Sequence, residues 1–151
     1  MSVRKTTPLS DSKSRLLKRL CEESDHPFHR MGAILYKGGA AISVGFNKTG
    51  SSKLMTRNHR LRPFAQTLHA EVSAVIGVSK EEASKCDLIV GRITAGGSFA
   101  LAKPCAMCQA VLKQMRVRRV YFTTGGYEDG SPQIEQLTEE NKESTQVCYH
   151  V

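Results

Sequence analysis

Two short motifs contain the residues of this chain that are best suited to chemistry. Residues 69–71 read His-Ala-Glu, and residues 104–108, about thirty positions later, read Pro-Cys-Ala-Met-Cys. The first motif places an imidazole and a carboxylate two residues apart, and the second places two thiols one helical turn apart after a proline. His69, Cys105 and Cys108 together suit one zinc ion, because catalytic zinc sites commonly use three protein ligands and leave the fourth position to water.

The cysteine pair by itself has other interpretations. Cys-x-x-Cys can form half of a structural zinc site or a redox pair. A redox pair needs no His-x-Glu motif elsewhere in the chain. Both motifs together, each at the start of an apolar helical pattern, favour a catalytic zinc site with Glu71 as its free carboxylate. A structural site would need a fourth ligand, which only the tertiary fold could bring from one of the remaining candidates, Cys21, Cys86, Cys148, His59 or His150.

The motifs and three further segments resemble the cytidine deaminase-like superfamily, over residues 28–124. H-x-E followed by P-C-x-x-C is the signature of zinc-dependent nucleobase deaminases. Residues 31–36 resemble the first strand of the family's opening hairpin, residues 45–47 the end of its second strand, and residues 117–122 the strand after the cysteine helix. The resemblance implies an α/β fold, a three-layer α/β/α sandwich around a five-stranded mixed sheet, with Zn²⁺ bound at the N-termini of two helices.

The resemblance also implies a role for each motif residue in hydrolytic deamination. Zinc lowers the pKa of a bound water to about 7, and Glu71 can carry protons from that water to the ring nitrogen and to the departing ammonia. Ala70 is small enough to let a planar base approach the metal, and Pro104, which also suits a helix start, is placed with it at the substrate. Asn47 is expected to contact the sugar, the alternative being a cap at a strand end.

Length and composition predict one compact enzyme domain over residues 1–151. The 151 residues suffice for a sizeable core, and we expect residues 1–8 to be flexible. No apolar run approaches the length of a membrane span, and no apolar stretch follows the basic N-terminus as in a secretory signal. Five cysteines, two of them assigned to the metal, favour reduced thiols over a disulfide framework, which predicts a cytoplasmic protein.

The spacing of apolar residues predicts alternating helices and strands. Helices are expected over residues 10–23, 68–78 and 105–115. Strands are expected over residues 31–36, 40–46, 88–95 and 117–123, the first two joined by a tight turn at 37–39. The zinc ligands then lie in the first turns of their helices, where backbone amides and the helix dipole favour negative charge.

Two arrangements of the C-terminal residues stay open. After the turn-rich residues 125–130, either a hairpin leads into a fifth, antiparallel strand over 133–137, or a helix covers 133–142 and a strand lies near 146–151. In the superfamily that the chain resembles, the first arrangement is typical of nucleoside deaminases and the second of nucleotide, tRNA and polynucleotide deaminases. The Gly-x-Asn at residues 45–47 favours the second group, whereas the inserted residues 93–102 fit neither.

Two substrate classes fit the sequence. The first, which we prefer, is a free cytidine nucleoside or nucleotide, with deoxycytidylate as the leading candidate. Arg60, together with Arg57 and Arg62 in the long loop over residues 48–66, would then bind phosphate, because guanidinium groups bind phosphate through paired hydrogen bonds. The second class is cytosine or adenine in single-stranded DNA or in RNA, including tRNA.

The second class is indicated by charge, since 22 basic and 14 acidic residues give a formal net charge of +8. The basic residues are dispersed along the chain, which is equally typical of a solvated surface. A nucleic-acid-binding module without catalysis would have no use for Glu71. The oligomeric state stays open, because members of the resembled superfamily range from monomers to hexamers.

Overall fold

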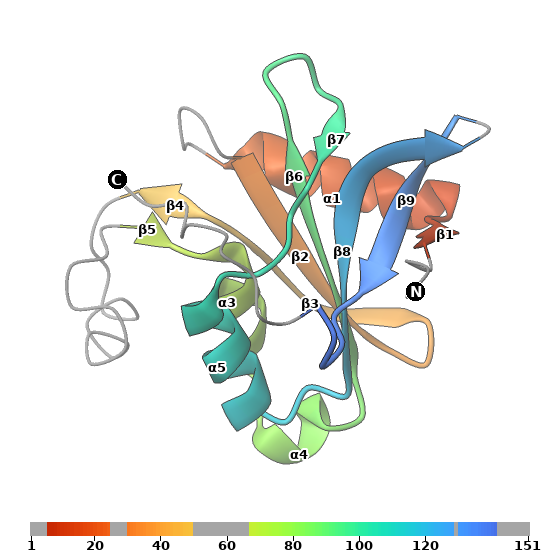
Figure 1. Ribbon diagram of the computed structural model, residues 1–151. Helices are drawn as coiled ribbons and strands as arrows, with labels where there is room; N and C mark the ends of the chain where they lie inside the picture. The colour runs from red at the N-terminus through yellow and green to blue at the C-terminus, as the bar shows by residue number, and fades with distance from the viewer. Residues whose placement is uncertain (1–5, 25–29, 50–66, 129, 142–151) are drawn as a thin grey trace.

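The computed structural model describes residues 6–24, 30–49, 67–128 and 130–141 (Figure 1). The helices are α1 (Asp11–Glu23), α3 (Ala70–Val75), α4 (Lys80–Ala83) and α5 (Ala106–Gln114). The strands are β1 (Thr6–Pro8), β2 (Arg30–Lys37), β3 (Ala40–Phe46), β4 (Lys48–Thr49), β5 (Thr67–Leu68), β6 (Asp87–Ile93), β7 (Phe99–Ala100), β8 (Arg119–Glu128) and β9 (Ser131–Gln136).

One mixed sheet forms the middle of the fold, with strand order β1-β9-β8-β6-β2-β3 and β7 paired to β6. Strands β6 and β8 are parallel and the other pairs are antiparallel. Helix α1 covers one face, while α3 and α5 lie side by side on the other (Figure 1). The predicted three-layer α/β/α class is therefore confirmed. The five expected strands correspond to β2, β3, β6, β8 and β9, and the short strands β1 and β7 extend the sheet beyond them.

The central strands separate two apolar cores because successive side chains point to opposite faces of a sheet. Leu35 and Val90 pack with α3 and α5, whereas Ile34 and Ile89 pack with α1 through residues such as Leu17. Strands β2 and β6 are thus covered on both faces, which explains their nearly continuous apolar sequences. This double burial fixes the sheet against which both motif-bearing helices rest.

Strand β9 decides the structure of residues 131–136, for which the sequence left two arrangements open. Strand β9 runs antiparallel to β8 as the second arm of a hairpin, so the helix expected over residues 133–142 in the second arrangement is wrong. Gly130 has φ +78° at the turn, a conformation that glycine adopts without steric penalty. Strand β9 lies between β8 and β1, and these long-range pairings override its weak local pattern. The alternative strand near residues 146–151 lies outside the described residues.

The N-terminal segment differs from the expected flexible end. Thr6–Pro8 form strand β1, in which Thr7 pairs with Ile134 of β9. Leu9 follows with 3% of its surface exposed, and its N–H donates to Pro132 O at 2.8 Å. Burial of Leu9 and this backbone pairing hold the segment against the sheet. Residues 1–5 lie outside the described part of the chain.

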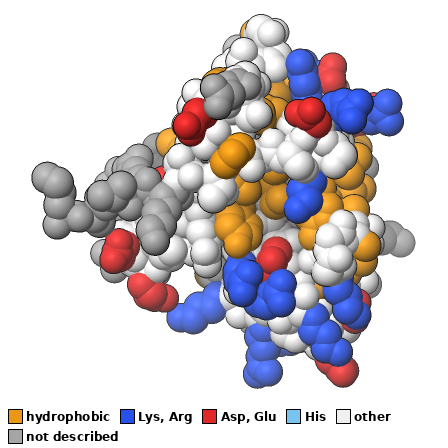
Figure 2. Space-filling view, turned by 90° about the vertical axis from the view of Figure 1, so that its right-hand side faces the viewer, with side chains coloured by type: hydrophobic (Ala, Val, Ile, Leu, Met, Phe, Trp, Pro, Cys, Tyr) orange, Lys and Arg blue, Asp and Glu red, His pale blue; other side chains and the backbone are white. Residues whose placement is uncertain are grey.

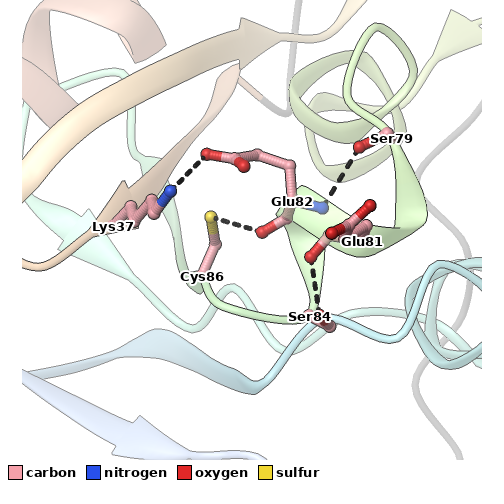
Figure 3. Close-up of polar contacts among 6 residues, drawn as sticks. All are labelled: Lys37, Ser79, Glu81, Glu82, Ser84 and Cys86. Atoms are coloured by element: carbon pink, nitrogen blue, oxygen red, sulfur yellow. Dashed lines mark hydrogen bonds and ion pairs between the residues drawn. The ribbon is translucent and has the colours of Figure 1, made fainter.

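Helix α4 was not expected from the sequence, and its polar contacts are shown in Figure 3. Ser79 caps it by accepting a hydrogen bond from Glu82 N–H at 3.1 Å. Lys37 Nζ lies 2.9 Å from Glu82 Oε1, and Cys86 Sγ donates to Glu82 O at 3.2 Å. The helix thereby joins the end of β2 to the start of β6, at the end of the molecule where α3 and α5 terminate (Figure 1).

The inserted residues 93–102 form a hairpin at the end of β6. Strand β7 turns back onto β6, pairing Phe99 with Ile93, and the chain then runs beside β8 before it enters α5. The part of the chain that the structure describes contains no helix with the length and apolar character needed to cross a membrane.

Candidate metal and active site

The predicted zinc ligands lie where two helices begin. His69 is the N-cap of α3 and Cys105 is the N-cap of α5, both with extended backbone, and Cys108 lies in the first turn of α5. Helix α3 is shorter than the expected helix over residues 68–78, because residues 67–68 pair as β5 instead. Since α3 and α5 pack against each other on one face of the sheet, their N-terminal ends bring the two motifs together.

The three donor atoms form one compact group. His69 Nδ1 lies 3.0 Å from Cys108 Sγ and 4.0 Å from Cys105 Sγ, and all three ligand atoms lie within 4.8 Å of one another. Zinc–ligand bonds of about 2.0–2.3 Å in a tetrahedral site would separate such atoms by roughly 3.5–3.8 Å. All three residues are buried. This nitrogen and two sulfurs therefore fit Zn²⁺.

A fourth protein ligand is not found among the described residues, where the group has three members. Cys21 donates to Gly91 O at 3.4 Å, and burial raises the pKa of its thiol to about 12, which makes it a poor metal ligand. Cys86 lies near α4, and both cysteines are free thiols, as expected. Cys148, His59 and His150, the other candidates for a structural site, lie outside the described residues. A zinc held by three ligands keeps one position for water or substrate.

Glu71 is enclosed beside this group. Its side chain is 1% exposed, and Oε1 has no hydrogen-bond partner among the residues that the structure describes. Burial raises the pKa of the Glu71 carboxyl above its ordinary value, and the nearby His69 opposes that rise. A buried carboxyl oxygen without a partner is costly to the fold. Its presence beside three zinc-type donors is what a site for water and a polar substrate requires.

Asn47 is buried at the end of β3 and joins two other elements. Its Oδ1 accepts hydrogen bonds from Ser24 Oγ at 2.6 Å and from Met31 N–H at 2.8 Å. Ser24 directly follows α1, and Met31 lies near the start of β2. These are the contacts of a strand-end cap, the alternative considered for this residue. The sugar contact stays a prediction.

Gly45 and Ser43 hold α3 against β3, a role that the sequence analysis missed. A Cβ at Gly45 would lie 2.5 Å from Ala74 N and 2.6 Å from Ala70 O, so only glycine fits there. Ser43 Oγ donates to Ala74 O at 2.6 Å. The sequence feature that could have predicted this role is a glycine within a strand, which often marks a place where another backbone approaches closely. Through this contact β3 positions Ala70, which is fully buried, between the two motif residues.

The remaining predicted substrate residues divide into two groups. Pro104 is buried directly before α5, and its carbonyl accepts from Gln109 Nε2 at 2.8 Å. Arg60, with Arg57 and Arg62, lies outside the described residues, so its phosphate contact stays a prediction.

Comparison with known proteins places this site in a family. Residues 10–124 match the cytidine and deoxycytidylate deaminase zinc-binding region. A deaminase in the luxG 3′ region of Aliivibrio fischeri is 30% identical over 100 residues, which span 65% of this chain and 60% of that relative. The chain therefore matches less than two thirds of that relative's length.

Two solved structures share the fold. The dCMP deaminase from the cyanophage S-TIM5 in apo form is 19% identical with a TM-score of 0.50, over 81% of this chain and 89% of that one. The cytidine deaminase from Burkholderia pseudomallei is 16% identical with a TM-score of 0.50, over 79% of this chain and 86% of that one. Because the matched region spans residues 10–124 and contains both motifs, the chain belongs to the cytidine and deoxycytidylate deaminase zinc-binding family.

Proposed function

We propose that this protein catalyses the hydrolytic deamination of cytosine to uracil in a free nucleoside or nucleotide. The observation that carries the proposal is the buried group of His69, Cys105 and Cys108 beside Glu71, whose Oε1 has no hydrogen-bond partner in the described part of the chain. Membership of the deaminase family supports the reaction class. A structural zinc site would gain nothing from an enclosed carboxylate beside its ligands.

The motif residues divide the reaction between binding and proton transfer. His69, Cys105 and Cys108 would hold the zinc, with each thiolate at the N-terminal end of α5, where the helix dipole favours negative charge. When bound, zinc supplies a water whose pKa is low enough for it to act as a nucleophile near neutral pH. The new bond joins the water oxygen to C4 of cytosine, and the bond from C4 to the exocyclic nitrogen breaks.

Glu71 carries the protons that balance this exchange. It accepts one proton from the attacking water and gives it to the ring nitrogen. It then takes the remaining proton from the new hydroxyl on C4, which becomes a carbonyl, and gives it to the departing amine, which leaves as ammonia. The Glu71 side chain is only 1% exposed, so bulk water has little access to the carboxyl, and no described residue forms a hydrogen bond with Oε1. Ala70 and Pro104 are buried neighbours of His69 and Cys105 in the chain, and we assign to them the small apolar side chains against which a planar base would lie.

The direction of β9 supports the free nucleoside among the substrates considered. An antiparallel fifth strand reached through a hairpin is typical of nucleoside deaminases in the superfamily that the chain resembles, and β9 is antiparallel to β8. Asn47 has the contacts of a cap, which weakens the motif that favoured nucleotide deaminases. Deoxycytidylate stays a candidate through Arg60, and the cytoplasmic location that we infer would supply either substrate.

A polynucleotide substrate is the second candidate, favoured by the formal net charge of +8. On the face that Figure 2 shows, lysine and arginine side chains occupy separate areas, with acidic side chains among them and an apolar hollow between them. A phosphate backbone is bound most strongly along a continuous basic surface. The arrangement on this face is therefore a weaker argument for a polymer than the total charge.

The test is a substrate panel on the zinc-loaded protein, with Glu71→Gln as the matched variant. Cytidine, deoxycytidine, CMP, dCMP, adenosine, single-stranded DNA and tRNA are compared at low and moderate salt, with ammonia release as the readout. We expect conversion of a free cytosine compound, and loss of at least about 100-fold in Glu71→Gln with zinc retained. Conversion of polymer alone, falling steeply with salt, would establish the second candidate. A zinc-loaded protein that deaminates nothing in the panel would overturn both.

A further inference from the structure

We propose that Thr123 is a positioning residue for the zinc site, acting through the segment that leads into Cys105. This segment, residues 100–104, is called the approach segment below. The inference rests on the proposed role of Cys105 as a ligand. It assigns a purpose to residues 93–102, which interrupt the chain between β6 and α5 without forming a helix.

Thr123 holds the approach segment through both its side chain and its backbone. Its Oγ1 donates to Ala100 O at 2.7 Å, and its carbonyl accepts from Ala102 N–H at 2.9 Å. Thr123 has no exposed surface, whereas its acceptor residue Ala100 is half-buried. Ala102 lies three residues before Cys105 and is also fully buried. Thr123 of β8 therefore holds two residues of the approach segment, Ala100 and Ala102, in place.

Other side chains hold the same segment from its two sides. Leu101 O accepts from Arg92 Nε at 3.0 Å, and Pro104 O accepts from Gln109 Nε2 at 2.8 Å. The chain just before the approach segment is held as well, since Phe99 N–H donates to Tyr127 Oη at 2.5 Å. The backbone before and after the residues that Thr123 contacts is thus also held by hydrogen bonds, which come from side chains of β6, β8 and α5.

Such fixation matters because Cys105 lies before the first turn of α5, at its N-cap. The helix by itself positions Cys108, but the position of Cys105 depends also on the chain that precedes it. Metal sites require ligands within about 0.5 Å of their working geometry. A threonine hydroxyl that donates to a carbonyl oxygen is a directional contact, and its loss removes one hydrogen bond that holds Ala100 to β8.

The test compares Thr123→Val, which removes the hydroxyl at nearly constant shape, with Thr123→Ser, which keeps it. The matched control is Thr124→Val. Thr124 pairs with Leu101 through its backbone, but its hydroxyl donates to Gln133 O at 3.4 Å and accepts from Gly126 N–H at 3.2 Å, so the substitution removes no side-chain bond to the approach segment. The readouts are the rate of zinc transfer to a chelator and the absorption spectrum of the Co²⁺-substituted protein, both measured well below the unfolding midpoint. We expect Thr123→Val to lose zinc roughly five- to tenfold faster with a shifted Co²⁺ spectrum. Thr123→Ser and Thr124→Val should match the wild type.

Two outcomes would overturn the inference. If Thr123→Val lowers the unfolding temperature but leaves the zinc transfer rate and the spectrum unchanged, the threonine only stabilises the fold. If Thr123→Val does not fold, Arg92→Met tests the same segment by removing the donor to Leu101 O, and an unchanged transfer rate would reject the positioning role. A wild-type protein without thiolate–Co²⁺ absorption would instead overturn the ligand assignment, which keeps the two proposals separable.

Discussion

His69 Nδ1 lies 3.0 Å from Cys108 Sγ although the two residues are 39 positions apart in the chain. The contact exists because α3 and α5 lie side by side on one face of the sheet with their N-terminal ends together (Figure 1). The site is therefore a product of helix packing, and the residues that fix the two helices on the sheet should control it.

Replacing Cys105 with serine should reduce bound zinc and lower the unfolding temperature of the protein. A serine hydroxyl is a much weaker zinc ligand than a thiolate, and structural stability is coupled to metal binding where ligands are buried. Elemental analysis of the purified variant gives the zinc content. Cys86→Ser is the control, because Cys86 lies near α4 and away from the donor group. A normal zinc content in Cys105→Ser would contradict the ligand assignment.

Glu71 should make the stability of the zinc-free protein depend on pH. Burial raises the pKa of this carboxyl in the folded state, so the folded protein holds a proton that the unfolded chain releases above its ordinary pKa of 4.5. The stabilising contribution is complete below that value and is lost as the pH rises through the folded-state pKa. Wild type should therefore lose stability relative to Glu71→Gln as the pH rises from about 4 towards 7.

Urea unfolding of both zinc-free proteins over that pH range measures the effect. Only the difference between the two proteins is used, because His69 and the thiols are common to both. A difference that does not change with pH would show that the Glu71 carboxyl titrates normally in the folded state.

Gly45→Ala should displace α3 and weaken the site. The new Cβ would lie 2.5 Å from Ala74 N and 2.6 Å from Ala70 O, where backbone atoms cannot move aside without shifting the helix. We expect a loss of roughly 1–3 kcal/mol in the free energy of unfolding, with faster zinc loss. Gly77→Ala is the matched control, since a Cβ there meets nothing within 4 Å. Equal behaviour of the two variants would reject the close-approach argument.

Asn47→Ala should lower stability, because two hydrogen bonds to Oδ1, from Ser24 and from Met31, are lost in the interior. The expected loss is about 1–3 kcal/mol by urea unfolding. A sugar contact makes a separate prediction: kcat/KM for cytidine should fall more than kcat/KM for free cytosine. Asn47→Asp, which keeps an acceptor at Oδ1, serves as the control for stability. If kcat/KM falls equally for cytidine and for cytosine, the sugar contact is rejected and only the cap role of Asn47 is supported.

Local chemistry made several features of this protein predictable. The strands near residues 31–36 and 40–46 and the helix near 105–115 were expected from apolar spacing, and the structure confirms them as β2, β3 and α5. These elements are encoded by contiguous residues, whose propensity and periodicity are read directly. The same holds for the zinc donor types, since Cys-x-x-Cys after a proline is a feature of one helix start.

Other features depend on contacts between residues far apart in the chain, which the local sequence pattern does not identify. Ser131–Gln136 pairs with both Arg119–Glu128 and Thr6–Pro8, and those neighbours decide that it is a strand antiparallel to β8. Thr6–Pro8 in turn is ordered because β9 supplies backbone acceptors and Leu9 becomes buried. Strand propensity is weak compared with such contacts, which is why the C-terminal arrangement stayed open in the sequence.

The sequence by itself predicted the two donor motifs and the helices that carry them, because each motif and each helix is encoded by neighbouring residues. Only the tertiary structure decided the 3.0 Å approach of His69 to Cys108, the cap role of Asn47 and the hold of Thr123 on the approach segment. Each of these is a contact between residues at least 16 positions apart. Distances across such separations follow from the packing of whole elements, which periodicity and spacing do not specify.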